Sequence, residues 1–121
     1  MAYEQNLQSY SAPAAADLSA YQYRFIVLDS TGSMALAGAG ARCDGVLQDK
    51  PEAGRVGCYA PGGTAMVVAG APIPAGTRVM SDNQGRAVPY VAADQVFPAG
   101  KTKNVAALAV GDVVPVMLEM N

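Results

Sequence analysis

From residue 21 onward, short apolar runs alternate along the chain with steps of glycine and proline. The first run, YQYRFIVLD at 21–29, is rich in aromatic and β-branched residues and predicts a strand of seven to nine residues. The turn STG follows at 30–32, and SMALA at 33–37 predicts the returning strand of a hairpin. GAGA at 38–41 then ends that strand in a loose turn.

The same texture continues through the middle of the chain. RCDGVLQD at 42–49 predicts a strand, in which Gly45 marks a bulge or a close approach of two backbones. KPEAG at 50–54 predicts a turn whose Gly54 supplies a positive φ. RVGCYA, PGG and TAMVVAG, at 55–70, predict a strand, a turn and a second strand.

GAPIPAG at 70–76 cannot be helical, because each proline lacks an amide proton and disfavours the helical region for the residue before it. We expect an extended connection at a sheet edge or a crossover. TRVMSD, NQG and RAVPYV, at 77–91, predict a hairpin in which Gly85 adopts left-handed geometry and Pro89 marks an edge strand.

AADQVFPAGKTKN at 92–104 is the longest predicted surface loop, and 92–96 could form one helical turn. Gly111 and Asp112 signal a turn before the last run. That run, at 113–118, contains valines that suit only a central or well-covered strand. Pro115 interrupts its ladder, so one side of this strand should be an edge or a bulge.

About nine short strands with turn signals between them predict an all-β fold, either a small barrel or a sandwich. The length of 121 residues suits one domain, and we assign 21–121 to a single β domain. Residues 1–20 are polar and alanine-rich and cannot bury enough surface to order alone. We expect them to form an extended arm, docked on a neighbouring chain or on the body of the chain's own fold.

Composition argues against most enzyme chemistry. The chain has no histidine, which removes the commonest base at neutral pH and every Ser-His or Cys-His arrangement. The candidate carboxylates lie almost all beside turn residues, where they bind their own backbone; they are Asp29, Asp44, Asp49, Glu52, Asp82, Asp94 and Asp112. We therefore expect no catalytic, cofactor-binding or metal-binding residues, and no enzyme activity.

Two further residue types leave alternatives open. Cys43 and Cys58 are either small buried hydrophobes or the two halves of a disulfide. Tyr21, Tyr23 and Phe25 would share one face of a strand, which serves either as core or subunit interface or as a stacking platform for sugars or bases.

Charge and hydropathy limit the partners. The net charge is −2 and the eight Lys and Arg are scattered singly, so we expect no direct contact with nucleic acid. The apolar runs are shorter than the roughly 20 residues of a membrane span, and residues 1–22 lack the features of a secretory signal. We expect synthesis in the cytoplasm and no membrane partner.

From Ala20 to Leu118 the chain resembles the small cement, or head decoration, proteins of tailed bacteriophages. The resemblance lies in RFIVLDSTGSMALAG, CDGVLQD, GAPIPAGTRVMSDNQGRAVP and ALAVGDVVPVMLEM, in that order. The third of these segments also looks like the β-clip or β-tulip arrangement of lambdoid decoration proteins and, separately, of some sugar-acid enzymes and antifreeze-like domains.

The resemblance implies a structural virion protein that binds the outer surface of the phage head and stabilises contacts of the major capsid protein. It implies self-assembly, as a homotrimer rather than a dimer, on the outside of a capsid made in the host cytoplasm. The arm would pair with an edge strand of the capsid protein or of a neighbouring copy. The β-clip likeness keeps open the alternative of a module that binds a saccharide or another small ligand.

Three regions are the expected contacts with partners. Tyr3, Leu7 and Tyr10 would anchor the arm; Pro72, Ile73 and Pro74 would form a stiff apolar tip or seam; Phe97, Lys101 and Lys103 would lie in an exposed loop that faces an acidic surface.

Overall fold

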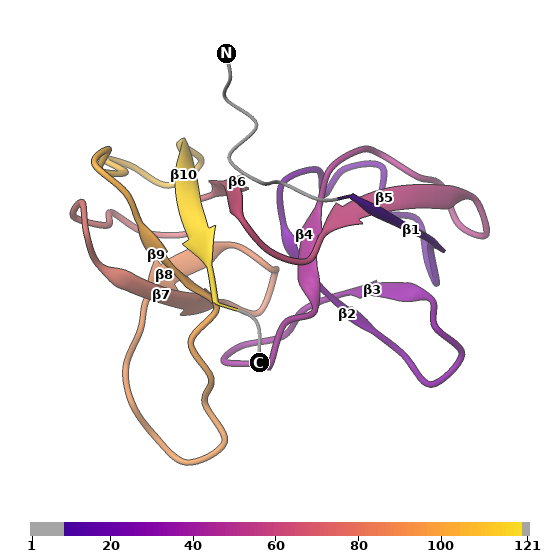
Figure 1. Cartoon of the computed structure of the whole chain (residues 1–121), viewed down its shortest axis with the longest axis horizontal. Helices are drawn as coiled ribbons and strands as arrows, with labels where there is room; N and C mark the ends of the chain where they lie inside the picture. Colours follow the sequence, from indigo (N-terminus) through magenta and orange to yellow (C-terminus); the bar gives the residue numbers. More distant parts are fainter. Residues whose placement is uncertain (1–8, 120–121) are drawn as a thin grey trace.

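The computed structural model describes residues 9–119, which form ten strands in two antiparallel five-stranded sheets (Figure 1). The first sheet contains, in spatial order, β1 (Tyr10–Pro13), β5 (Val56–Ala60), β4 (Gly45–Leu47), β2 (Phe25–Leu28) and β3 (Met34–Leu36). The second contains β6 (Thr64–Val68), β10 (Val113–Leu118), β9 (Gly100–Thr102), β7 (Arg78–Ser81) and β8 (Ala87–Pro89). The all-β, sandwich-like prediction is confirmed, and the sheets do not close into a barrel.

Each sheet is built from one continuous half of the described chain, so the indigo and magenta strands lie on one side of Figure 1 and the orange and yellow strands on the other. The predicted strands at 55–70 are present as β5 and β6. They belong to different sheets, because the PGG step at 61–63, where Gly63 has a φ of 78°, carries the chain across.

Alternation along the strands of the first sheet buries both of its faces. One face packs against the second sheet in a shared core, with the fully buried Phe25 and Val46 on one side and Val79 and Val116 on the other. The opposite face carries a second cluster, which includes Ile26, Leu47 and Tyr59 together with Ala14 and Leu18 from the segment after β1.

The predicted β7–β8 hairpin is confirmed, with Gly85 at a φ of +73° and β8 at the edge of its sheet. The tip of this hairpin docks on the first sheet, since the Phe25 amide donates to the Gly85 carbonyl at 2.7 Å. A Cβ atom at Gly85 would lie 2.8 Å from both the Phe25 oxygen and the Leu36 Cδ1 atom. Only glycine fits this close approach in this backbone conformation.

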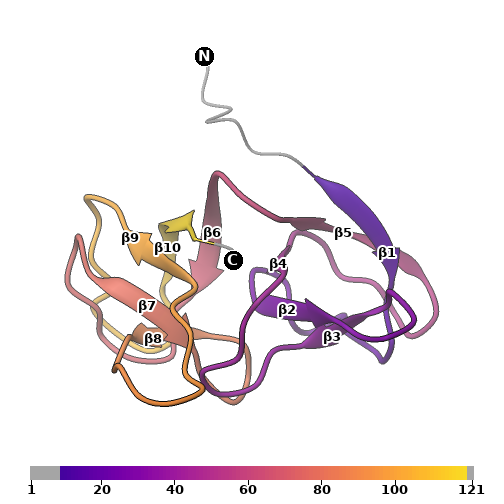
Figure 2. The same ribbon diagram turned by 60° about the horizontal axis from the view of Figure 1, so that its bottom comes forward.

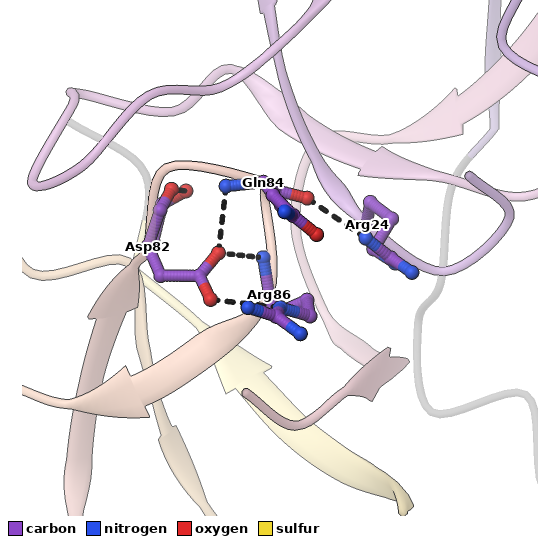
Figure 3. A network of polar contacts seen from close by, with 5 residues as sticks. Arg24, Asp82, Gln84 and Arg86 are labelled. Atoms are coloured by element: carbon purple, nitrogen blue, oxygen red, sulfur yellow. Dashed lines mark hydrogen bonds and ion pairs between the residues drawn. The ribbon is translucent and has the colours of Figure 1, made fainter. Parts of the chain in front are cut away.

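A small polar network fixes the same hairpin tip (Figure 3). Asp82 Oδ1 accepts hydrogen bonds from the amides of Gln84 and Arg86, each at 2.8 Å, and Asp82 Oδ2 pairs with Arg86 Nε at 2.8 Å. Arg24 of the first sheet's entry segment donates to the Gln84 carbonyl at 3.0 Å. The two sheets are thereby joined by polar contacts as well as by their shared core.

The strand predicted for 21–29 begins only at Phe25, so this part of the prediction is wrong. Tyr23 has a φ of 65°, its amide donates to the Leu47 carbonyl, and its own carbonyl accepts from the Val68 amide. Tyr23 therefore bridges the two sheets, and this breaks the alternation. Tyr21, Tyr23 and Phe25 do not share a strand face, and Phe25 is fully buried.

The loop predicted for 92–104 is also corrected. Residues 92–96 form no helical turn; a turn at 94–95, with Gln95 at a φ of 64°, takes its place. Residues 100–102 are β9, which lies between β10 and β7. The Thr102 hydroxyl, fully buried, donates to the Pro74 carbonyl at 2.8 Å and accepts from the Thr77 amide at 2.9 Å, which locks this short strand in place.

Pro115 lies where a missing amide proton does no harm. It is opposite Met66 of β6, while the pairing of β10 with β9 stops at Val116, as the predicted edge on one side requires. The Lys103 carbonyl beyond that point accepts from the Gly76 amide instead. The proline therefore leaves no ladder partner unsatisfied.

Cys43 and Cys58 are free thiols, so they form no disulfide in this structure. Gly45 and Gly54 behave as predicted, the first at a close approach to the Ala60 backbone and the second at a φ of 78°. No helix suited to crossing a membrane occurs within residues 9–119.

Candidate functional site

Two loops meet at the end of the second sheet that points away from the first (Figures 1 and 2). They are 69–77, between β6 and β7, and 103–112, between β9 and β10. Ile73 and Ala107 join them through two reciprocal backbone hydrogen bonds of 2.9 Å. An open hollow of about 340 Å³ lies over this bridge, lined by Pro72, Ile73, Pro74, Ala106, Ala107 and Leu108.

Several apolar side chains of these two loops are exposed. Leu108 is 81% exposed, Val110 60% and Val105 48%, and both Pro72 and Pro74 are exposed as well. We call these five residues the apolar tip. Pro72, Pro74 and Leu108 line the same hollow, and exposed apolar side chains gathered in this way are typical of an interaction site in a soluble protein.

The backbone of the tip is held firmly in spite of this exposure. Asp112 Oδ2 accepts hydrogen bonds from the Leu108 amide at 2.8 Å and from the Ala109 amide at 3.1 Å. The Gly111 amide donates to the Ala69 carbonyl at the end of β6. Leu108 is therefore presented on an ordered turn, which lowers the entropy that would be lost when a partner covers it.

The three residues of the predicted seam differ in their exposure. Pro72 and Pro74 lie in the apolar tip, as expected. Ile73 is only 1% exposed and packs in the shared core, so its side chain is not part of an exposed seam. The alternation of an extended segment explains the difference, because neighbouring side chains point to opposite sides.

Val105, Leu108 and Val110 were not among the residues predicted as contacts. Their run, VAALAV, is apolar throughout, and such runs are more often buried. The usable signal was the Gly111-Asp112 turn directly after it, since a carboxylate in a turn can hold the preceding residues at the surface.

Phe97, Lys101 and Lys103 do not form one exposed loop, so that expectation is wrong. Phe97 is half-buried beneath the Arg42 guanidinium, whose carbon lies 4.5 Å from the ring centroid. Lys101 is exposed, but it lies on β9, which is a central strand of the second sheet and not a loop. Lys103 is half-buried just beyond β9, and its carbonyl accepts from Gly76 next to the tip.

Of the predicted arm anchors, Tyr10 lies on β1, is 51% exposed and meets the Tyr59 ring edge-on, with 5.9 Å between the centroids. Tyr3 and Leu7 lie outside the described residues.

The acidic residues with the clearest geometry are turn residues, as predicted. Asp29 accepts hydrogen bonds from Thr31 and Ser33, and the bond from the Thr31 hydroxyl is the main reason that the pKa of Asp29 is lowered. Asp82 and Asp112 likewise accept amides of their own turns. Within residues 9–119, no group of three or more acidic or cysteine side chains is close enough to hold a metal ion.

A second, more polar hollow of about 310 Å³ is lined by Arg78, Lys101, Met117, Leu118 and Glu119. Arg78 and Glu119 form an ion pair of 3.2 Å there, with both side chains about half exposed, so solvent screens it strongly. Neither of these two hollows is lined by a tyrosine. Tyr21, Tyr23 and Phe25 do not form the stacking platform considered from the sequence, because β2 begins only at Phe25 and the Phe25 side chain is fully buried.

No protein-family model matches the chain, and no curated protein shows significant similarity to it. Among solved structures, the fold is similar to the crystal structure of the head fiber gp8.5 N base of bacteriophage phi29. The TM-score is 0.74 at 21% sequence identity, and the match covers 93% of this chain and 94% of that chain. At this identity the likeness establishes the fold, and it extends over both sheets.

Proposed function

We propose that this chain is a structural protein of a bacteriophage head. More specifically, it acts as a capsid decoration, or cement, protein that binds the outer surface of the head and stabilises contacts between major capsid protein subunits. One observation carries the proposal: over 93% of its length the chain shares its fold with the base of a phage head fiber. The resemblance of its sequence to decoration proteins points in the same direction.

The contact with the capsid protein, in this proposal, is made by the apolar tip. Its residues are exposed, uncharged and fixed by backbone hydrogen bonds and by Asp112. Complete burial of one leucine side chain contributes about 1.5–3 kcal/mol, so Leu108 alone would raise the affinity by roughly ten- to a hundredfold. The chain transforms no substrate and acts through binding.

The proposal includes self-assembly on the head as a homotrimer, made in the host cytoplasm and located on the outer capsid surface. Its support is the resemblance to decoration proteins. Repetition on a closed shell favours such a role, because several weak contacts of a linked assembly combine into tight binding.

The experiment uses the purified full-length chain and expanded heads assembled from the major capsid protein of the same phage. We expect the chain to co-sediment with the heads to a saturating ratio and to raise the temperature at which they disassemble. Leu108→Asp should weaken binding at least about tenfold.

Val91→Asp is the matched control for this variant. Val91 is also an exposed apolar residue in a loop, but that loop connects β8 to β9 and lies at the opposite end of the second sheet from the tip (Figure 1). Its binding should be unchanged. If the wild-type chain fails to co-sediment with heads, the proposed function is wrong; if the two variants bind equally, the tip is not the contact.

A second candidate is the base of a head fiber, which the structural neighbour favours directly. A fiber base anchors an appendage and has no need to strengthen the shell. Binding to heads without any rise in their disassembly temperature would therefore support the fiber base over the cement protein.

A further inference from the structure

The outer face of the second sheet, which points away from the shared core, is open within residues 9–119. The corresponding face of the first sheet is covered, because Ala14 and Leu18 pack on it. On the second sheet, Met66, Val113 and Met117 are each 41% exposed although all three lie in strands. An exposed apolar face of this kind is available to a partner.

Three side chains form a row across this face, on three neighbouring strands. Arg78 of β7 lies directly opposite Lys101 of β9, and Lys101 lies directly opposite Met117 of β10. Residues directly opposite each other in antiparallel strands project from the same face of the sheet, so the three side chains are neighbours. Two positive charges in such a position repel each other. The pair of Arg78 and Lys101 therefore costs stability in the free chain.

Glu119 supplies one negative charge nearby, and this charge is used by Arg78. Glu119 Oε1 accepts hydrogen bonds from Arg78 Nε at 3.4 Å and from Arg78 Nη2 at 3.2 Å. The Arg78 guanidinium carbon also lies 5.3 Å from the centroid of the Tyr90 ring. Within residues 9–119, the Lys101 ammonium has neither a hydrogen bond nor an ion pair. One positive charge, that of Lys101, consequently stays uncompensated.

This charge lies at the polar hollow of about 310 Å³, whose other lining residues are Arg78, Met117, Leu118 and Glu119. A carboxylate that enters the hollow can form an ion pair with Lys101 and reduce its repulsion with Arg78. An apolar residue beside that carboxylate can cover the exposed Met117 side chain. The combination of an unpaired cation and an apolar wall thus fits an acidic segment of a protein.

The polar hollow and the apolar tip lie at the two ends of β10. Asp112, which holds the tip, directly precedes this strand, and Leu118, which lines the hollow, is its last residue. The six residues of the strand span about 20 Å. A protein that stabilises the contact between two capsid subunits has to bind both of them. Two separate surfaces of different chemistry meet this need.

We propose that the polar hollow binds an acidic segment of a second major capsid protein subunit, while the apolar tip binds the first. The inference rests on the proposed function, to which it adds the second attachment site. Lys101 is the residue that pairs with the carboxylate of the partner. The repulsion between Arg78 and Lys101 in the free chain is relieved when this carboxylate arrives.

Lys101→Glu tests the proposal in the same experiment with expanded heads, because it replaces attraction by repulsion. Its affinity for heads should be at least about fivefold lower than that of the wild-type chain in roughly physiological salt. At concentrations that saturate the heads, it should raise their disassembly temperature less than the wild-type chain does, because only the tip is then attached. Lys101→Arg keeps the charge and should behave like the wild-type chain.

Lys50→Glu is the matched control, since it makes the same change in net charge at an exposed lysine between β4 and β5 of the first sheet. It should bind heads like the wild-type chain. Val91 does not line the hollow, so Val91→Asp remains a control for the tip. The urea midpoint of Lys101→Glu should be no lower than that of the wild-type chain, because the repulsion with Arg78 is removed; this also shows that the variant folds.

Equal binding of Lys101→Glu and Lys50→Glu overturns this inference and leaves the proposed function intact. A wild-type chain that does not bind heads, or that binds without raising their disassembly temperature, overturns the cement function and this inference together. A change in the oligomeric state of free Lys101→Glu in solution also overturns the inference, because the hollow would then belong to a contact between copies of this chain.

Discussion

Replacement of Gly85 by alanine tests most directly how the two sheets are joined. Gly85 occupies the β7–β8 turn at a φ of +73°, and its carbonyl accepts the Phe25 amide of the first sheet. The added methyl group would lie 2.8 Å from the Phe25 oxygen and from Leu36 Cδ1. The Leu36 side chain can move aside, but the Phe25 oxygen belongs to the backbone of β2.

Three contributions set the magnitude. An alanine in left-handed geometry costs about 1–2 kcal/mol. Overpacking against a backbone that cannot yield typically costs about 1–3 kcal/mol. A shift that relieves the contact weakens the hydrogen bond from Phe25 to Gly85, whose net contribution is about 0.5–1.5 kcal/mol. We therefore expect Gly85→Ala to lower the free energy of unfolding by about 3–5 kcal/mol.

Gly76→Ala is the matched control, because Gly76 has a similar φ of +70° but no atom within 4 Å of the place that an added methyl group would occupy. It should lose only the conformational contribution of about 1–2 kcal/mol. Urea unfolding measures both, and a difference of about 2 kcal/mol shifts the midpoint by roughly 1 M at an ordinary denaturant slope. Equal losses within about 0.5 kcal/mol would refute the close docking of the hairpin tip on the first sheet.

Two further predictions concern buried polar and titratable groups. Thr102→Val removes a hydroxyl that donates to the Pro74 carbonyl and accepts from the Thr77 amide, so it should lower the free energy of unfolding by about 1–3 kcal/mol. Thr102→Ser keeps the hydroxyl and should retain most of this stability. Equal losses of both variants in urea unfolding would contradict the assignment. Burial raises the pKa of Cys43 to about 12. The unfolded thiol ionises near pH 9, whereas the folded thiol stays neutral there. The contribution of the neutral thiol to the free energy of unfolding is therefore fully present below pH 9 and is lost as the pH rises towards 12, by about 1.4 kcal/mol per pH unit. Urea midpoints between pH 8 and 10.5 should fall less steeply in Cys43→Ala than in the wild-type chain or in the control Cys58→Ala, and parallel slopes in all three would contradict the prediction.

Features that depend on a few neighbouring residues could be predicted from the sequence. The β7–β8 hairpin follows from NQG and from Pro89, and Gly54 and Gly85 adopt positive φ because their turns require it. The all-β class follows from the repeated short runs between glycine and proline steps.

Features set by distant partners could not. Tyr23 leaves the strand pattern because the Leu47 carbonyl and the Val68 amide, far apart in the sequence, hold its backbone. β9 is only three residues long, and it is fixed by the contacts of Thr102 with residues 74 and 77. No local pattern in the sequence GKT predicts these contacts.

The candidate site was predicted in part for the same reason. Pro72 and Pro74 were expected in an apolar tip because proline stiffness is local. The exposure of Leu108 depends on Asp112 and on the bridge between Ile73 and Ala107, which bring two loops together. An apolar residue in the core and one at an interface look the same in a sequence.

The division of the chain at residues 61–63 has a consequence for the order of folding during synthesis. The cluster of Ile26, Leu47 and Tyr59 needs only residues 12–59, so the first sheet can close this face before the second sheet has been translated. The other face of that sheet, with Phe25 and Val46, receives its cover only when strands β6 to β10 arrive. A nascent chain halted between the two halves would thus expose the apolar face of the first sheet, which is prone to aggregation. We expect chaperones to bind ribosome-bound chains that end in this region.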